Sequence, residues 1–224
     1  MCNQCSLVCP HGVIRPYLLD DKEEENAPES VKRDLQSALI KDQNLKFTIS
    51  VNMDQCTGCG LCSKVCPGKK GEKALEMRPA VNVKTEQEIK KNEYLYNNVK
   101  EKKVMSTATI KGSQFIRPKF EFPGACAGCG ETPYLKLLSQ LFGGELVISN
   151  ATGCSSIYGG SIPATSYNIP WANSLFEDNA EFGFGLALAD KYQKEKIKKI
   201  IYNNLKAVPE KYREVVASYY KHTD

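Results

Sequence analysis

Seven of the ten cysteines fall into two runs that share one spacing. The runs are Cys2-x2-Cys5-x3-Cys9-Pro10 and Cys56-x2-Cys59-x2-Cys62-x3-Cys66-Pro67. Thiolates at this spacing are typical ligands of [4Fe–4S] clusters, in which three closely spaced cysteines bind one cube and the fourth binds a neighbouring cube. The first run lacks its leading cysteine, which would stand two positions before Met1. We therefore expect the chain to be an interior piece of a longer protein.

The crossing pattern of two-cluster ferredoxins predicts how these cysteines share two clusters. One complete ligand set is expected, made of Cys9, Cys56, Cys59 and Cys62. The other set contains Cys2, Cys5 and Cys66, and its fourth ligand is missing, so its cluster is expected to be labile. Zinc and inert buried cysteines are the alternatives, but structural zinc sites pair two Cys-x2-Cys knuckles around one ion. One-electron transfer is the function that the pattern favours.

The other three cysteines lie in the second half of the chain, as the pair Cys126 and Cys129 followed by Cys154. The pair belongs to Gly124-Ala-Cys-Ala-Gly-Cys-Gly-Glu-Thr-Pro-Tyr134, and Cys154 belongs to Asn150-Ala-Thr-Gly-Cys-Ser-Ser-Ile-Tyr-Gly-Gly160. Spacing alone leaves a second zinc knuckle or a redox-active pair open here, because Cys-x2-Cys is a weak signal. Glycines and hydroxyl residues around Cys154 indicate a turn where the backbone approaches a ligand closely.

Composition narrows the class of protein further. The 224 residues are 42% hydrophobic and 25% charged, and no apolar run approaches the ~18 residues of a membrane span. The start of the chain has no secretory signal, and clustered thiolate spacing points to a reducing compartment, either the cytoplasm or an anaerobic reducing organelle. The net charge of +4 is too dispersed for nucleic-acid binding.

Three segments are expected along the chain: a ferredoxin-type domain over 1–83, a connector helix and linker over 84–114, and a partial α/β domain over 115–224. Within the first, the acidic run Asp20 to Glu25 predicts an exposed loop, and Ala74 to Val83 predicts a turn and a short strand. The fold class is therefore α+β, ending in a helical C-terminal segment.

The third segment has its own pattern of elements. Thr132 and Pro133 predict a helix start, and Leu135, Leu138, Leu141 and Phe142 form an apolar stripe that predicts a core face. Gly143-Gly144 ends this helix, Glu145 to Ser149 predicts a buried strand, and a loop follows. A lysine-rich helix is expected over 182–206 and a second one from Pro209 to about Lys221.

The motifs around Cys56, Cys126 and Cys154, with Trp171-Ala-Asn-Ser-Leu-Phe-Glu-Asp-Asn-Ala-Glu-Phe-Gly183, resemble the single-chain pyruvate:ferredoxin (flavodoxin) oxidoreductases. The resemblance implies oxidative decarboxylation of pyruvate to acetyl-CoA and carbon dioxide, with thiamine diphosphate and Mg²⁺ as cofactors. It also implies coenzyme A as a substrate, ferredoxin or flavodoxin as electron acceptor, and is compatible with a homodimer. It implies that residues 115–224 form part of a thiamine-diphosphate-binding domain, in which Cys126, Cys129 and Cys154 ligate a third cluster. It also implies that Glu131 and Cys154 border the thiamine diphosphate.

The sequence departs from this family in three respects. The family's Gly-Asp-Gly and Asn-Thr-Gly segments, which hold the magnesium and the diphosphate, have no counterpart in the chain. The domains that precede the ferredoxin module in the family are absent, and the loop between Tyr167 and Pro170 is shorter. We therefore expect no turnover of pyruvate by this chain alone. A free-standing ferredoxin-type carrier and an oxidoreductase for another 2-oxo acid remain as alternatives.

Overall fold

The computed structural model describes residues 1–38, 40, 43–69, 71–160 and 169–221. Tyr167, in the loop expected to be short, lies outside the described residues. The chain divides into two compact units. The first unit contains Met1–Ile148 and Gly153–Trp171, and the second contains Ser149–Thr152 and Ala172–Asp224. The domain boundaries predicted from the sequence stay predictions.

A three-stranded antiparallel sheet forms the centre of the first unit, in the order β1-β3-β2. Its strands are β1 (Ile14–Leu19), β2 (Gln36–Ser37) and β3 (Lys46–Val51). The β1–β3 register runs from the pair Ile14 and Val51 to the pair Leu19 and Lys46. Ile14, Leu18 and Leu19 are buried, because successive side chains of a strand alternate between its two faces and both faces are covered here.

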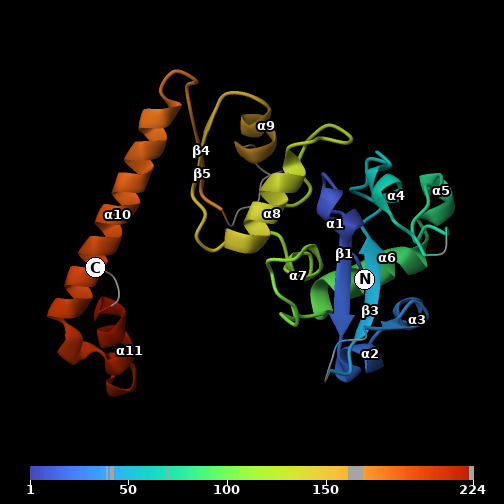
Figure 1. Ribbon diagram of the computed structural model, residues 1–224, viewed down its shortest axis with the longest axis horizontal. Coiled ribbons are helices and arrows are strands. Elements are labelled where there is room, and N and C mark those ends of the chain that lie inside the picture. The colour runs from blue at the N-terminus through green and yellow to red at the C-terminus, as the bar shows by residue number, and fades with distance from the viewer. Residues whose placement is uncertain (39, 41–42, 70, 161–168, 222–224) are drawn as a thin grey trace. The chain divides into compact units, whose positions relative to one another are not determined.

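Short helices surround this sheet, and one longer helix lies against β3 (Figure 1). They are α1 (Gln4–Val8), α2 (Asp21–Glu25), α3 (Glu29–Lys32), α4 (Leu61–Val65), α5 (Ala80–Val83), α6 (Glu86–Asn98) and α7 (Ile110–Ser113). Leu95 of α6 is fully buried in a cluster with Leu19, Ala27 and Val31. The predicted connector helix is therefore confirmed, but it packs into the first unit rather than standing apart as a linker.

The acidic run is a helix and not the exposed loop that the sequence predicted. Asp20 caps α2 through a capping box with Glu23, whose carboxylate accepts from the backbone N–H of Asp20 at 3.0 Å. The same carboxylate forms an ion pair with Lys102 and accepts a hydrogen bond from the backbone N–H of Lys100 at 2.9 Å. Local capping and a distant lysine therefore order a segment whose composition alone indicated a solvated loop.

A second correction concerns Ala74 to Val83. Among its described residues there is no strand, and the segment ends in the short helix α5. Leu75 packs against the cluster of Cys5, Cys9, Val13 and Ile14. The other large apolar side chains of the segment's exposed part, Met77 and Val81, face solvent, so little burial is available to stabilise a strand here.

Helix α8 (Thr132–Phe142) forms where the sequence predicted it, with Pro133 in its first turn, but it presents the opposite face to the core. Leu138 and Phe142 of the apolar stripe are 42% and 51% exposed, whereas Lys136 is 2% exposed. The buried positions are Thr132, Lys136, Ser139 and Gln140. These polar residues also recur at helical spacing. Hydrogen bonds of Lys136, Ser139 and Gln140 to neighbouring segments stabilise this face against the core.

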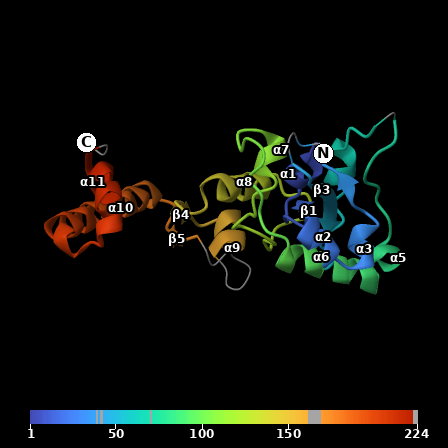
Figure 2. The same cartoon turned by 90° about the horizontal axis from the view of Figure 1, so that it is seen from below.

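Helix α9 and strands β4 and β5 follow α8 along the chain. Helix α9 (Cys154–Gly160) lies beside α8 in both views (Figures 1 and 2), and its Tyr158 ring meets the ring of buried Phe120 at 6.1 Å. The expected strand is β4 (Ile148–Ala151), which is half-buried, and it pairs with β5 (Trp171–Ser174). The residues expected to form a loop around Cys154 are instead the start of α9.

The second unit is mostly helical, as the sequence predicted. It contains α10 (Asn179–Asn203), the 3₁₀ turn Leu205–Ala207 and α11 (Glu210–Lys221). No residue of α10 is buried. The mixed helix and strand content agrees with the expected class, while a thiamine-diphosphate-binding domain over 115–224 remains a prediction.

Replacement of Leu95 by alanine should lower the free energy of unfolding by about 2–5 kcal/mol, because it removes a fully buried side chain and leaves a cavity. Urea unfolding followed by circular dichroism measures the change. The matched control is Val81→Ala, at a side chain that is 86% exposed, and it should change stability little. Equal losses in the two variants would contradict the packing described for α6.

Candidate iron–sulfur sites

The pairing of β1 with β3 brings the two cysteine runs together. Ile14 follows Cys9 by five residues and pairs with Val51, which precedes Cys56 by five residues. The end of the first run and the start of the second therefore leave the same end of the sheet. Helices α1 and α4, which carry the runs, contact each other.

The two runs are structural repeats as well as sequence repeats. Each contains a five-residue helix, preceded by a left-handed residue and followed by an extended cysteine. Asn3 has φ 60° and Gly60 has φ 77°, while Cys9 and Cys66 have ψ 114° and 116°. Glycine enters the left-handed region without a steric penalty, and asparagine is one of the few other residues that tolerates it. One backbone geometry therefore presents both sets of thiols.

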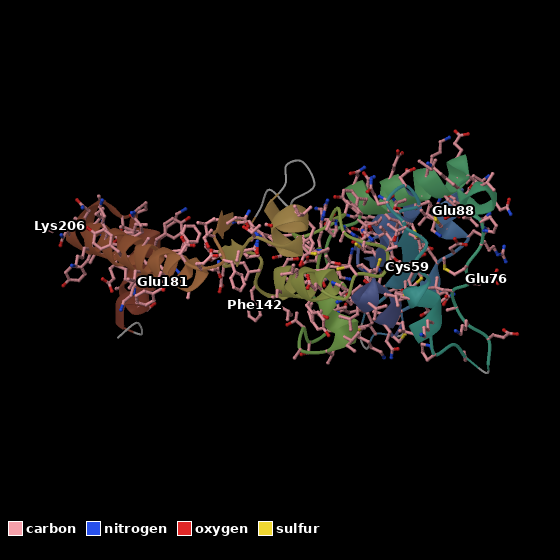
Figure 3. The ribbon with its side chains drawn as sticks, turned by 90° about the horizontal axis from the view of Figure 1, so that it is seen from above. Cys59, Glu76, Glu88, Phe142, Glu181 and Lys206 are labelled. Carbon is pink, nitrogen blue, oxygen red and sulfur yellow. The ribbon has the colours of Figure 1, made fainter. Side chains whose placement is uncertain are left out.

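The predicted complete set gathers around Cys62. Burial raises the pKa of its thiol, and the charges of Cys9, Cys56 and Cys59 raise it further. Cys9 is buried, Cys62 is half-buried, and Cys56 and Cys59 are exposed; Figure 3 labels Cys59. Thiols that disfavour one another's ionisation are close in space, and a cluster would relieve this mutual repulsion by binding them as thiolates.

The second predicted set gathers around Cys5. Burial raises the pKa of the Cys5 thiol to about 11, against a lowering hydrogen bond from the backbone of Ser6. The charges of Cys2, Cys62 and Cys66 raise it as well. Cys2 and Cys66 belong to the set predicted with Cys5, and Cys62 belongs to the other, so the two sets are adjacent.

Cys66 differs from Cys5 because backbone N–H groups surround its sulfur. The N–H of Ala74 donates to Cys66 Sγ at 3.3 Å. Burial raises the pKa of Cys66, but hydrogen bonds from Ala74, Gly68 and Leu75 outweigh it, and the pKa falls below its ordinary value. Hydrogen bonds to a thiolate favour the charged form, which is the form that binds metal.

The third group of cysteines repeats the loop geometry of the second run. Cys56-Thr-Gly-Cys-Gly60 and Cys126-Ala-Gly-Cys-Gly130 share glycines at positive φ, Gly58 at 69° and Gly128 at 75°. The N–H of Glu131 lies 3.5 Å from Cys129 Sγ. The pair therefore has a backbone conformation already used by the ferredoxin-type run.

Tyr158 shows that Cys129 and Cys154 are neighbours. Its hydroxyl donates to Glu131 Oε2 at 2.8 Å. Burial raises the pKa of Tyr158, and so do Glu131, Cys129 and Cys154. Glu131, Cys129 and Cys154 were predicted as site residues, but Tyr158 was not. Tyr158 lies four residues after Cys154 and so on the same face of α9.

The third group also adjoins the first set. A Cβ atom built on Gly128 would lie 3.7 Å from the Cβ of Cys59. The loop between Cys126 and Cys129 therefore lies in contact distance of a thiol predicted to bind a different cluster.

All ten cysteines are free thiols. Within the described ranges, no three His, Cys, Asp or Glu side chains converge on a point where a single metal ion would bind. The ligands of a cube bind different iron atoms and so stand further apart than the ligands of one ion. An all-thiolate donor set on adjacent loops fits an iron–sulfur cluster.

Lys136 was not among the site residues predicted from the sequence. It reaches the first cysteine run, where its Nζ donates to the backbone carbonyl of Ser6 in α1. The stripe of Thr132, Lys136, Ser139 and Gln140 was the signal that could have found it.

Comparison with protein families agrees with this geometry. Residues 1–70 match the family described as 4Fe-4S dicluster domain. Over 198 residues the chain is 54% identical to the pyruvate:ferredoxin oxidoreductase of Moorella thermoacetica, covering 84% of this chain and 16% of that protein. Over 194 residues it is 46% identical to the pyruvate-flavodoxin oxidoreductase of Enterobacter agglomerans, with the same coverage.

The chain is homologous to a segment of the pyruvate:ferredoxin and pyruvate-flavodoxin oxidoreductases. The resemblance inferred from its motifs is thereby confirmed. The chain spans 16% of the length of these two oxidoreductases. Among the described helices, none combines the length and the hydropathy that crossing a membrane requires.

The unequal thiol environments predict unequal alkylation in the metal-free protein. Iodoacetamide reacts with the thiolate, whose fraction rises with pH through the pKa. Cys66, with a lowered pKa, should be alkylated well below the pH at which Cys5, with a pKa of about 11, reacts. Peptide mass spectrometry across a pH series measures both profiles. In denaturant the two should coincide, and coincidence in the folded protein would contradict the described hydrogen bonds.

Proposed function

We propose that this chain is the electron-transferring segment of an enzyme that oxidatively decarboxylates pyruvate to acetyl-CoA and carbon dioxide. In this proposal electrons leave through [4Fe–4S] clusters to ferredoxin or flavodoxin. The names of the homologous proteins support the substrate and the acceptors. The observation that carries the proposal is the gathering of Cys9, Cys56 and Cys59 around Cys62, on two runs joined by a strand pair.

The donors fit the clusters that the family implies. One cluster would be held by Cys9, Cys56, Cys59 and Cys62, a second by Cys2, Cys5 and Cys66, and a third by Cys126, Cys129 and Cys154. Iron–sulfur clusters, when bound, supply one-electron oxidation and reduction at a potential set by charge, hydrogen bonds and solvent exposure.

The chain's own residues control those three factors. Cys5 and Cys9 are each 6% exposed and lie in an apolar cluster with Val13 and Ile14, which keeps water from their side of the site. Backbone N–H groups donate to Cys66 and Cys129, which stabilises the thiolate form. A Cβ built on Gly128 would lie 3.7 Å from the Cβ of Cys59, so the loop of the third group is close to the first set, and short separation favours electron transfer between sites.

Glu131 and Cys154 are proposed to border thiamine diphosphate, as in the family. The Glu131 carboxylate accepts from Tyr158, which fixes its orientation beside Cys129. The family's Gly-Asp-Gly and Asn-Thr-Gly segments, which hold Mg²⁺ and the diphosphate, have no counterpart in this sequence. We therefore derive no step through thiamine diphosphate from this chain.

Anaerobic reconstitution with iron and sulfide tests the cluster assignment. The Cys59→Ser variant should lose about four iron atoms per chain relative to wild type, because serine replaces a thiolate of the complete set. Iron and acid-labile sulfide are counted, and the reduced protein is examined by electron paramagnetic resonance. Cys154→Ser is the control and should keep the signal that Cys59→Ser loses. Stoichiometric zinc without sulfide would overturn the proposal.

A pyruvate assay separates the enzyme segment from a free-standing ferredoxin-type carrier. The reconstituted chain should accept electrons from dithionite and pass them to ferredoxin or flavodoxin. With pyruvate, coenzyme A, thiamine diphosphate and Mg²⁺ in place of dithionite, it should show no reduction of the acceptor, because the sequence lacks the family's Gly-Asp-Gly segment, which holds the magnesium. Turnover of pyruvate would contradict this expectation.

A further inference from the structure

A buried lysine lies beneath the cysteine-bearing helix α1. Lys136 of α8 is 2% exposed. Its Nζ donates to the Ser6 carbonyl and to Gln114 Oε1, the latter at 3.1 Å. The Gln114 amide in turn donates to Gln140 Oε1 at 3.0 Å. These partners satisfy hydrogen bonds of the ammonium group, and all of them are neutral.

The charge of Lys136 has no carboxylate partner among the described residues. Lys136 meets α1 at Ser6, between Cys5 and Cys9, and these two cysteines would be negative thiolates when they bind clusters. Arg15 carries the same charge as Lys136 and is itself paired with Glu121. Burial lowers the pKa of Lys136 to about 8, and the two cysteines oppose that shift. A buried charge is costly unless an opposite charge compensates it. Cys9 and Cys5 belong to the two predicted ligand sets, one each.

We propose that the buried ammonium of Lys136 is the counter-charge for the two clusters of the ferredoxin-type domain and raises their reduction potentials. Reduction adds one electron to a cluster that already carries negative thiolates. A fixed positive charge nearby stabilises the reduced state more than the oxidised state, since Coulomb energy grows with the charge it acts on. Lys136 acts on the clusters through its charge and does not bind them, so it is a positioning residue. This role deepens the proposed function and rests on it.

Burial makes this charge effective. Between groups taken out of water the interaction is screened far less than at the surface. The lysine comes from α8, which follows the Cys126–Cys129 loop, whereas the thiols it faces come from α1 and its C-terminal end. One helix therefore carries a charge that acts on clusters bound by another part of the first unit.

A small anion is the competing partner for the positive charge of Lys136. A cavity of about 310 Å³ reaches Lys136 and is also lined by Arg15, Tyr17, Arg117 and Gln140. Arg15 and Arg117 share the single carboxylate of Glu121, so these ion pairs compensate the two guanidinium charges only in part. The experiment must still distinguish the two sources.

The test is a redox titration of the reconstituted chain, monitored by electron paramagnetic resonance at neutral pH. Lys136→Met removes the charge and keeps the length of the buried stem, Lys136→Gln keeps an N–H donor, and Lys136→Arg keeps the charge. Lys90→Met is the matched control, because Lys90 is an exposed lysine of α6 that pairs with Glu86.

Both neutral variants should show about a tenfold lower ratio of reduced to oxidised cluster at a fixed applied potential, which is about 59 mV for a one-electron couple. Lys136→Arg and Lys90→Met should stay near wild type. Loss of clusters from both neutral variants, with retention in Lys136→Arg, would support the same role. Loss from all three, or one common shift in all three, would assign Lys136 a packing role and overturn the inference.

Two further outcomes are decisive. The wild-type reduction potential could depend on inorganic phosphate at constant ionic strength while that of Lys136→Met does not. This result would show that an anion in the cavity balances the charge of Lys136, and it would overturn the inference. Unchanged potentials in intact clusters would overturn it while leaving the proposed function standing. Absence of clusters from the wild-type chain would instead remove the proposed function.

Discussion

Antiparallel pairing between β1 and β3 is the constraint on which the cysteine sites depend. More than forty residues of chain separate the two runs. The strand pair brings the end of the first run and the start of the second to the same end of the sheet. Because side chains alternate along a strand, a slip of one residue in the register would turn Ile14 and Leu18 away from the core and shift Cys9 relative to Cys56. The helices α2 and α3 and the strand β2, which fill the segment between the runs, are secondary to this pairing.

Features that depend on local spacing were predictable from the sequence. The start and end of α8 and the helices α10 and α11 follow from glycine and proline positions and from periodicity. The ligand sets also follow from spacing, and the structure brings their thiols near one another without testing which clusters they bind. Homology to the oxidoreductases could be recognised from the sequence because the motifs around Cys56 and Cys126 are long and specific.

Features that depend on distant partners were not predictable. The buried face of α8 is polar because Ser6, Gln114 and Ile116 offer acceptors for Lys136 and Gln140, and nothing within the helix itself reveals them. The acidic run is ordered because Lys102 lies about eighty residues further along the chain. In both cases the local pattern allowed two outcomes, and a tertiary hydrogen bond or ion pair selected one.

The left-handed residues before α1 and α4 limit how the two runs can diverge. Few side chains tolerate that conformation, and most others pay roughly 1–2 kcal/mol for it. Asn3 is also buried, with its amide donating to the Lys111 carbonyl, whereas nothing lies within 4 Å of a Cβ built on Gly60. Substitution at position 3 is therefore restricted both by the left-handed backbone and by the contact with Lys111. Substitution at position 60 is restricted by the backbone alone. The two runs would therefore accept different replacements at equivalent positions.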